Sequence, residues 1–279
     1  MDHMNEQLRE WNDNAAAWRE HSATVRTMFA PLTAAIIEEA GISAGQSVLD
    51  VAGGPGEPSL TIAERVGPTG SVTCTDAVAG MVAAAEEEAK RRGLTNVRFR
   101  QCLAGELPFP DNSFDVAVCR LGVMFFPDVV AGLREMLRVV KARGAICLAV
   151  WGLAERNPFT SVVTEVMSHH VEMPATDPDA PGAFRFGERG KLVGLLQQAG
   201  AVNVRERELN FHIEAPITVE GYWQLRSATS GTLREKLEKL SPDVVEEIGS
   251  EVKDVAREYF PNGQMSFPGE MLIVSAKKP

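Results

Sequence analysis

The fold is decided by the stretch VLDVAGGPG, residues 48–56. An apolar run that is typical of a buried strand passes directly into a turn of small residues, and a helical pattern over 59–66 follows. Because Gly53, Gly54 and Gly56 have no side chains, the backbone of this turn can come close to a bound ligand. A βα turn that needs glycine only for tight packing would look similar, so the turn alone leaves both interpretations open.

The residue after the second predicted strand favours the nucleotide interpretation. This strand covers 71–75, and Asp76 stands where a carboxylate can accept hydrogen bonds from both ribose hydroxyls of a nucleotide. A dinucleotide site would need the spacing G-x-G-x-x-G, but the turn reads GPGEPS over 54–59 and has no third glycine. The Glu57 carboxylate would also repel a pyrophosphate at the helix N-terminus. We therefore expect a cofactor without phosphate, such as S-adenosylmethionine.

Apolar runs alternate with helical patterns along the first half of the chain. This alternation predicts βαβ units with right-handed crossovers, and hence a doubly wound, Rossmann-like α/β fold. We expect a mostly parallel seven-stranded sheet with helices on both faces and a helical cap. The expected strands are 47–52, 71–75, 97–101, 114–119, 145–151, 202–211 and 271–276. The expected helices are 5–20, 25–40, 59–66, 79–92, 129–140, 191–199, 219–228, 233–240 and 244–260.

The same patterns divide the chain into segments. Helices in 1–42 would form a lid, and 43–152 would form the cofactor-binding core. The remainder of the sheet and a loop would occupy 153–210, an inserted helical cap 211–269, and the final strand 270–279. We interpret the insert as a cap because it is far longer than a hairpin connection of about 2–5 residues.

The composition is that of a soluble globular protein. The chain has 279 residues, of which 44% are hydrophobic, and its net charge of −10 disfavours nucleic acid as a partner. No apolar run approaches the roughly 20 residues that span a bilayer, and the polar N-terminus lacks a signal sequence, so we expect no membrane insertion and a cytoplasmic location. We interpret the cysteines as buried free thiols and not as metal ligands, because no CxxC pair occurs among Cys74, Cys102, Cys119 and Cys147.

Four stretches together resemble one family. They are VLDVAGGPG (48–56), TCTDAV (73–78), GELPFPDNSFDVAVCRLGVMFFPD (105–128) and LREMLRVVKARGAICLAVWG (133–152). The chain resembles the class I S-adenosylmethionine-dependent methyltransferases, in particular the branch of the ubiquinone and menaquinone biosynthesis C-methyltransferases. The likeness covers roughly 48–152 and is specific as a set.

The resemblance implies where the cofactor would bind. The turn would hold the methionine end, Asp76 would bind the ribose, and the segments that follow the next two strands would contact the adenine. The residues expected to bind are Asp50, Ala52, Gly53, Gly54 and Gly56 at the methionine end, Asp76 at the ribose, and Ala77, Met81, Cys102, Leu103 and Ala104 at the adenine, together with Arg120 and Trp18.

Two positions depart from the family pattern. Ala52 stands where the first glycine is usual, and Leu103 stands where an aspartate often contacts the adenine amino group. The adenine would then be held by the backbone and by Cys102, Ala104 or Leu107.

The reaction itself asks little chemistry of the protein. Methyl transfer is an in-line displacement, so the protein mainly aligns the acceptor and excludes water. Arg120 ends the fourth predicted strand, where ligands of such sheets bind, and is a candidate catalytic residue because a buried arginine needs a partner. The neighbouring Met124 would form the floor of the site or pack in the core. Trp11 and Trp18 share one helix face and would either pack the helix or form a lid over the sulfonium.

A general base does not stand out. His169 and His170 are the best candidates, although histidines at an exposed helix end would look the same. A phenolate or enolate acceptor would need little base. Tyr222 and Trp223, at the start of the insert, would line a pocket for a flat apolar acceptor.

The expected function is methyl transfer from S-adenosylmethionine to a small-molecule acceptor, aromatic, quinol-like or phenol-like. Two alternatives stay open, a nicotinamide-dependent oxidoreductase on the same sheet and a non-catalytic cofactor-binding protein. The sequence leaves open the acceptor, the choice among O-, N- and C-methylation, and the oligomeric state, for which the insert would offer a homodimer interface.

Overall fold

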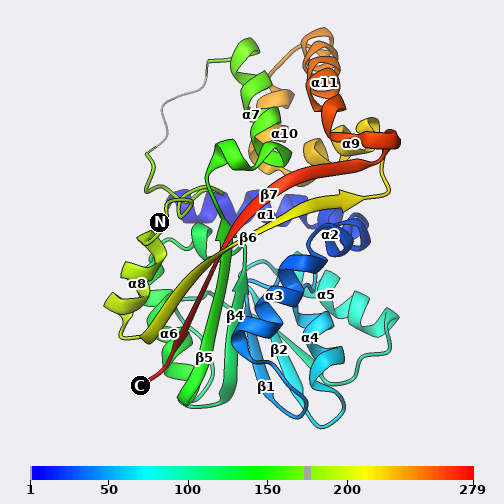
Figure 1. The fold of residues 1–279 in the computed structure, drawn as a ribbon. Coiled ribbons are helices and arrows are strands. Elements are labelled where there is room, and N and C mark those ends of the chain that lie inside the picture. Colours follow the sequence, from blue (N-terminus) through cyan, green and yellow to red (C-terminus); the bar gives the residue numbers. More distant parts are fainter. Residues whose placement is uncertain (1, 173–176) are drawn as a thin grey trace.

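The computed structural model describes residues 2–172 and 177–279. Their centre is a seven-stranded sheet with the order β3-β2-β1-β4-β5-β7-β6, which confirms the predicted fold class (Figure 1). The first five strands are parallel, and β7 runs antiparallel to both of its neighbours. The strands are β1 (Ser47–Val51), β2 (Ser71–Asp76), β3 (Val97–Gln101), β4 (Phe114–Arg120), β5 (Val140–Trp151), β6 (Val202–Ala215) and β7 (Met265–Lys277).

Helices cover both faces of this sheet. Figure 1 shows α6 (Val129–Val139) and α8 (Lys191–Ala199) on one side, where they pack on each other and on the strands beyond β4. On the other side lie α3 (Ala30–Ala40), α4 (Ser59–Val66) and α5 (Ala79–Arg91). Because both faces are covered, the central strands are largely buried and mostly apolar, and the core is continuous across them.

The order of the strands determines where a ligand can bind. The chain leaves β1 toward β2 on one side and later returns to β4 on the other, so β1 lies at the point where the winding direction reverses. Ligands of open α/β sheets bind beyond the carboxyl ends of the strands at this point. The glycine-rich turn follows β1 at this end of the sheet.

Several element boundaries differ from the sequence prediction, among them those of β5, β6 and β7 and of the helices predicted over 5–20, 233–240 and 244–260. The helix predicted over 25–40 is two helices, α2 (Ser22–Met28) and α3, which meet at Phe29. Pro31 lies in the first turn of α3, where a residue without an amide hydrogen fits, so a new helix begins there. The strands β6 and β7 are longer than predicted, and only 216–264 connect them.

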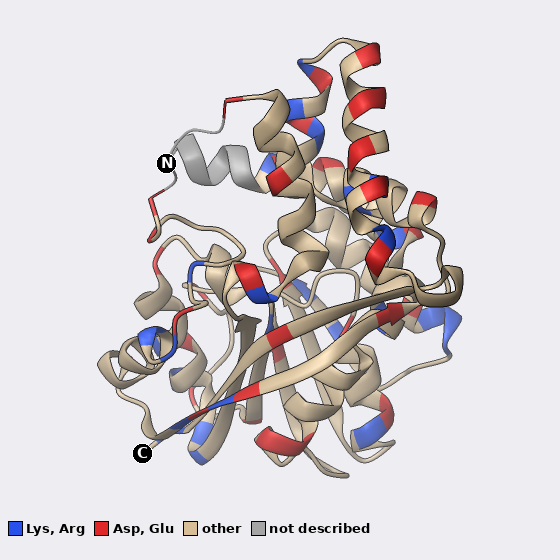
Figure 2. Ribbon diagram, turned by 45° about the horizontal axis from the view of Figure 1, so that its top comes forward, with Lys and Arg blue, Asp and Glu red and all other residues tan. Residues whose placement is uncertain are grey.

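These two long strands carry the cap above the rest of the sheet (Figure 1). The cap consists of α9 (Val219–Thr229), α10 (Gly231–Glu238) and α11 (Pro242–Ala256). These three helices pack against α7 (Pro158–His170) and α1 (Asp2–Glu20), which precede them in the sequence. Acidic residues are spread over the whole molecule and are frequent along α11 (Figure 2). None of the helices in the described residues is long and apolar enough to cross a membrane.

The four cysteines are free thiols, as predicted. Three of them, Cys74, Cys119 and Cys147, are fully buried in the sheet, and burial raises the pKa of each thiol above its usual value. Cys102 follows β3 and is half-buried. These side chains act as small apolar residues.

Candidate active site

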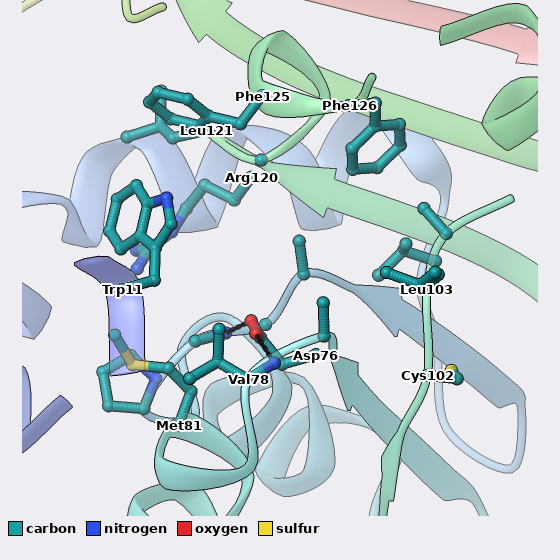
Figure 3. A pocket seen from close by; sticks show the side chains of 18 of the residues that line it. Trp11, Asp76, Val78, Met81, Cys102, Leu103, Arg120, Leu121, Phe125 and Phe126 are labelled. Carbon is teal, nitrogen blue, oxygen red and sulfur yellow. Dashed lines mark hydrogen bonds between the residues drawn. The ribbon is translucent and has the colours of Figure 1, made fainter. Parts of the chain in front are cut away.

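A cavity of about 420 Å³ opens beyond the carboxyl ends of β1, β2 and β4 (Figure 3). Its walls come from the turn after β1, from the segments after β2, β3 and β4, and from α1 and α2. Of the predicted cofactor-binding residues, those that line it are Ala52, Gly53, Gly54, Asp76, Ala77, Met81, Cys102, Leu103, Ala104, Arg120 and Trp18.

Asp76 and the turn are joined by hydrogen bonds (Figure 3). The Gly54 amide donates to one carboxylate oxygen of Asp76 and the Val78 amide donates to the other, both at 2.9 Å. Burial raises the pKa of Asp76, and these two hydrogen bonds act in the opposite direction. Each oxygen has further acceptor capacity, so the carboxylate can receive one additional donor on each side.

The turn has a backbone conformation that few residues adopt. Ala52 and Gly54 have φ values of 58° and 54°. A Cβ at Gly53 would overlap the Cys74 thiol and the Asp50 carboxylate, so glycine is required there. Ala52 tolerates the left-handed conformation that the usual glycine would supply, at a modest cost in strain.

Asp50 lies behind this turn and not on the cavity surface. One of its carboxylate oxygens accepts from the Ser59 amide at 3.1 Å and the Ser59 hydroxyl at 2.6 Å. The other, Oδ1, is buried and has no hydrogen-bond partner. Burial raises the pKa of Asp50 to about 7. Gly56, also expected at the pocket, is packed against Leu60 instead and does not line the cavity.

Glu57 is neutralised by a neighbour that the sequence did not indicate. Its carboxylate lies 2.7 Å from Arg92 Nη1, and both side chains are only 7% exposed although both line the cavity. The repulsion that we expected between Glu57 and a pyrophosphate is therefore largely cancelled. The choice between cofactors must rest on other evidence.

Arg120 supplies a positive charge at the cavity wall. Its Nη1 donates to the Thr33 hydroxyl and its Nη2 to the Glu57 carbonyl, both at 3.0 Å, and the guanidinium lies 5.7 Å from the centre of the Phe29 ring. Its partners are neutral oxygens, and within the described chain no carboxylate forms an ion pair with it. Burial lowers the pKa of Arg120 from its usual value.

Aromatic side chains form the wall opposite the turn (Figure 3). The Trp11 and Trp18 rings lie 6.1 Å apart, and Trp11 meets the Phe125 ring edge to face at 5.3 Å. Leu121 and Phe126 complete this apolar surface. The two tryptophans thus both pack α1 on the domain and line the cavity.

The end of the cavity beyond Asp76 is also apolar. Cys102, Leu103 and Ala104 line it on one side of Asp76, and Met81 lines it on the other, with Trp11 and Trp18 (Figure 3). Leu107 is buried outside the cavity. Val78 lines the same end and was missed by the sequence prediction, although its position two residues after Asp76 could have indicated it.

Four residues expected near the acceptor lie elsewhere. His169 and His170 lie on α7, and each ring forms a hydrogen bond with the Glu251 carboxylate of α11 at 2.7 Å. Neither lines the cavity, which contradicts their prediction as general bases. Tyr222 is fully buried in the cap, and its hydroxyl donates to the Phe159 carbonyl at 2.8 Å. Trp223 faces a separate groove between α9 and α11.

Comparison with known proteins identifies the chemistry. A family model described as the ubiE/COQ5 methyltransferase family matches residues 32–216. The chain belongs to the ubiE/COQ5 methyltransferase family. Members of this family are S-adenosylmethionine-dependent enzymes, so the protein is a methyltransferase with this cofactor, and the nicotinamide-dependent and non-catalytic alternatives are set aside.

Several curated relatives are similar to this chain. A demethylmenaquinone methyltransferase of Geobacillus kaustophilus is 38% identical over 191 residues, which cover 64% of this chain and 81% of that protein. The ubiquinone/menaquinone biosynthesis C-methyltransferase of Stenotrophomonas maltophilia is 43% identical over 109 residues, and the match spans only 43% of its length. An uncharacterized protein of Mycobacterium tuberculosis is 26% identical but matches 93% of this chain and 91% of its own.

Solved structures share the fold of this family member. A phosphoethanolamine N-methyltransferase of Haemonchus contortus has a TM-score of 0.59 at 17% identity and covers 98% of this chain and 60% of its own. A methyltransferase-like protein of Bacillus halodurans has a TM-score of 0.55 at 20% identity, covering 88% and 98%. At these identities the likeness extends to the fold alone.

The cavity suits a cation with an adenosine group. S-adenosylmethionine carries positive charge on its sulfonium and its ammonium. The buried Oδ1 of Asp50, directly behind the turn, lacks a donor, and a positive charge nearby would stabilise the ionised form of this carboxylate. Asp76 has the acceptor capacity that two ribose hydroxyls require.

Proposed function

We propose that this methyltransferase acts on a small, flat and largely apolar acceptor of the phenol, enol or quinol type. The observation that carries this proposal is the composition of the cavity wall away from the turn. That wall is formed mainly by aromatic and aliphatic side chains, with Arg120 as its cation, since the other lining arginine, Arg92, is paired with Glu57. Glu106 and Asp128 add carboxylates, and histidine, lysine and tyrosine are absent from the described lining. Such a surface favours an apolar ring that presents one acidic hydroxyl.

The same wall bears on the chemistry of the acceptor. An acceptor that carries a proton must lose it before attack, and the candidate bases among the described lining residues are carboxylates, of which Glu106 and Asp128 lie away from the turn. The Arg120 guanidinium would favour the anionic form of a phenol or enol and would disfavour a protonated amine beside it. The bound cofactor supplies an electrophilic methyl group, and the protein's part is to align the acceptor anion with it and to exclude water.

The cofactor would occupy the end of the cavity between the turn and Cys102. In this arrangement Asp76 accepts both ribose hydroxyls, Gly53 and Gly54 adjoin the methionine end, and Asp50 favours the cationic groups from behind the turn. Met81 and Leu103 contact the adenine. This leaves Arg120 for the acceptor, and the tryptophans of α1 would cover both the sulfonium end of the cofactor and the acceptor.

Names of relatives support this class of acceptor. The Geobacillus kaustophilus relative is named as acting on demethylmenaquinone. Because the matches to such relatives cover 39% and 64% of this chain, the acceptor is proposed from the cavity wall of this chain and not from theirs.

A screen with radiolabelled S-adenosylmethionine tests the proposal. Quinols, phenols and enols should take up label, whereas primary amines of similar size should not. Transfer only to amines would overturn the assignment of the acceptor class, and the absence of S-adenosylhomocysteine binding would overturn the site itself.

Variants of Arg120 then test its role. Arg120→Met should lower turnover by at least about thirtyfold and shift the pH–rate profile upward, because the acceptor hydroxyl would no longer be held in its anionic form. Binding of S-adenosylhomocysteine should change less than about threefold, and Arg120→Lys should restore part of the turnover. If instead S-adenosylhomocysteine binding is lost while 5′-methylthioadenosine still binds, Arg120 holds the cofactor carboxylate and not the acceptor.

A further inference from the structure

We infer that the connection between α9 and α10, residues 229–232, positions the acceptor wall by clamping α1, although the insert itself contributes no described side chain to the cavity. This α9–α10 connection is more than 200 residues away in sequence from the tryptophans that it would position. The inference rests on the proposed site but not on the identity of the acceptor.

The first contact of the clamp is a hydrogen bond. Trp18 Nε1 donates to the Thr229 carbonyl at 3.1 Å. Thr229 is the last residue of α9, so its carbonyl has no partner within that helix and is free to accept. The chain turns at Ser230, whose hydroxyl accepts from the Leu233 amide and begins α10. The turn between the helices therefore presents the carbonyl to Trp18 and fixes that ring.

The second contact is a close approach of two helices. Gly231 is buried against α1, and a Cβ there would overlap the side chains of Glu10 and Asn14. The Thr232 hydroxyl donates to the Glu10 carboxylate at 3.0 Å. Burial raises the pKa of Glu10, and this hydrogen bond acts in the opposite direction. Asn14 is 1% exposed, so α1 is held closely against α10.

The opposite face of α1 is held in the same way by the core. A Cβ at Gly80, at the start of α5, would overlap Ala15 of α1. Two glycines, one in the core and one in the insert, thus fix α1 from two sides. A shift at either glycine would move the helix as a body, because α1 is continuous over this region.

The consequence concerns the cavity wall. Leu8, Trp11 and Trp18 are the side chains that α1 contributes to the cavity lining. Trp11 transmits the position of Trp18 to Phe125 across their ring contacts. The insert therefore acts on the site through α1, and Gly231 and Thr229 are positioning residues.

The rate at which S-adenosylhomocysteine dissociates measures the clamp. Gly231→Ala should raise the dissociation rate constant at least tenfold and change the association rate constant less than threefold, because the loosened α1 no longer retains the bound ligand. The matched control is Gly194→Ala in α8, an exposed helical position where a Cβ meets nothing, and its rates should equal those of the wild type. Stopped-flow fluorescence of the full-length chain gives both constants.

A second variant protects the test against misfolding. Trp18→Phe keeps an aromatic ring but removes the N–H donor, and it should raise the dissociation rate constant by at least threefold. The inference would be overturned if the dissociation rate constant of Trp18→Phe equals that of the wild type and that of Gly231→Ala is either unchanged or cannot be measured. A wild-type chain that binds no S-adenosylhomocysteine would instead contradict the proposed site, so the two failures are distinguishable.

Discussion

The replacement of Asp76 by asparagine is the most direct test of the cofactor site. Each carboxylate oxygen already accepts one backbone amide, from Gly54 and from Val78. One further bond per oxygen is therefore available for the ribose. Asparagine has nearly the same shape but supplies only one acceptor oxygen, so its amide nitrogen must face a backbone N–H.

The expected loss follows from these contacts. Two charge-assisted hydrogen bonds to the ribose become neutral, and one of them changes its direction or is lost. At about 1–1.5 kcal/mol for each, the binding free energy falls by about 2–3 kcal/mol, which is about 30-fold to 150-fold in Kd. The unpaired Gly54 or Val78 amide also destabilises the turn by about 1–3 kcal/mol, and this effect would appear in thermal unfolding.

Isothermal titration calorimetry with S-adenosylhomocysteine measures the loss. The 2′-deoxy analogue of S-adenosylhomocysteine is the control ligand. It should bind the wild type more weakly than S-adenosylhomocysteine does, whereas the Asp76→Asn variant should bind the two ligands with nearly the same affinity. A folded variant whose Kd for S-adenosylhomocysteine stays within threefold of the wild type would refute the assignment of Asp76 to the ribose.

Three further predictions concern groups that the structure removes from the cavity surface. The pKa of Asp50 is raised from 3.8 to about 7 in the folded state, so the folded protein keeps a proton that the unfolded chain has lost, and its stability falls as the pH rises from about 4 to about 7. Between pH 5 and pH 7, chemical denaturation should show a decline in unfolding free energy that is about 2 kcal/mol smaller in Asp50→Asn than in the wild type. An equal decline in both proteins would contradict this prediction. The Arg226 guanidinium lies 5.0 Å from the centre of the Phe159 ring, and its buried Nε has no hydrogen-bond acceptor. Arg226→Met should therefore raise the melting temperature by an amount equivalent to about 1 kcal/mol. A lowered melting temperature would count against this prediction. Replacing His169 and His170 together by alanine should leave turnover within about twofold in the radiolabel assay, whereas a hundredfold loss would restore them as candidate bases.

The cofactor half of the site was predictable because its signals are local. The glycine turn directly follows β1 and the Asp76 carboxylate ends β2, the next strand in the sequence. The parallel pairing of β1 with β2 brings the turn and the carboxylate together. The Gly54–Asp76 hydrogen bond is the direct result of that pairing. For the same reason the fold class followed from the alternation of strands and helices, while the exact ends of β6 and β7 did not.

The charges around the turn were less predictable, because their effect depends on burial. Asp50 was expected to line the pocket, but Gly53 lies between it and the cavity. Glu57 was expected to repel phosphate, but Arg92 reaches back from the far end of α5 to pair with it. A sequence identifies an acidic residue, and only the fold determines whether a cation has been brought beside it.

The acceptor half could not be derived from composition, since an aromatic residue on a helix can serve the core or a cavity equally well. Tyr222 and Trp18 illustrate this: both have large rings and both make one hydrogen bond to a backbone carbonyl. The Tyr222 hydroxyl reaches a carbonyl inside the cap, so the ring is fully enclosed, whereas the Trp18 N–H reaches across to the cap from α1 and leaves the ring at the cavity wall. The position of the backbone carbonyl that each ring's donor reaches therefore distinguishes an enclosed aromatic residue from one at the cavity wall, and in the proposed site the insert would act by holding α1 and not by touching the acceptor itself.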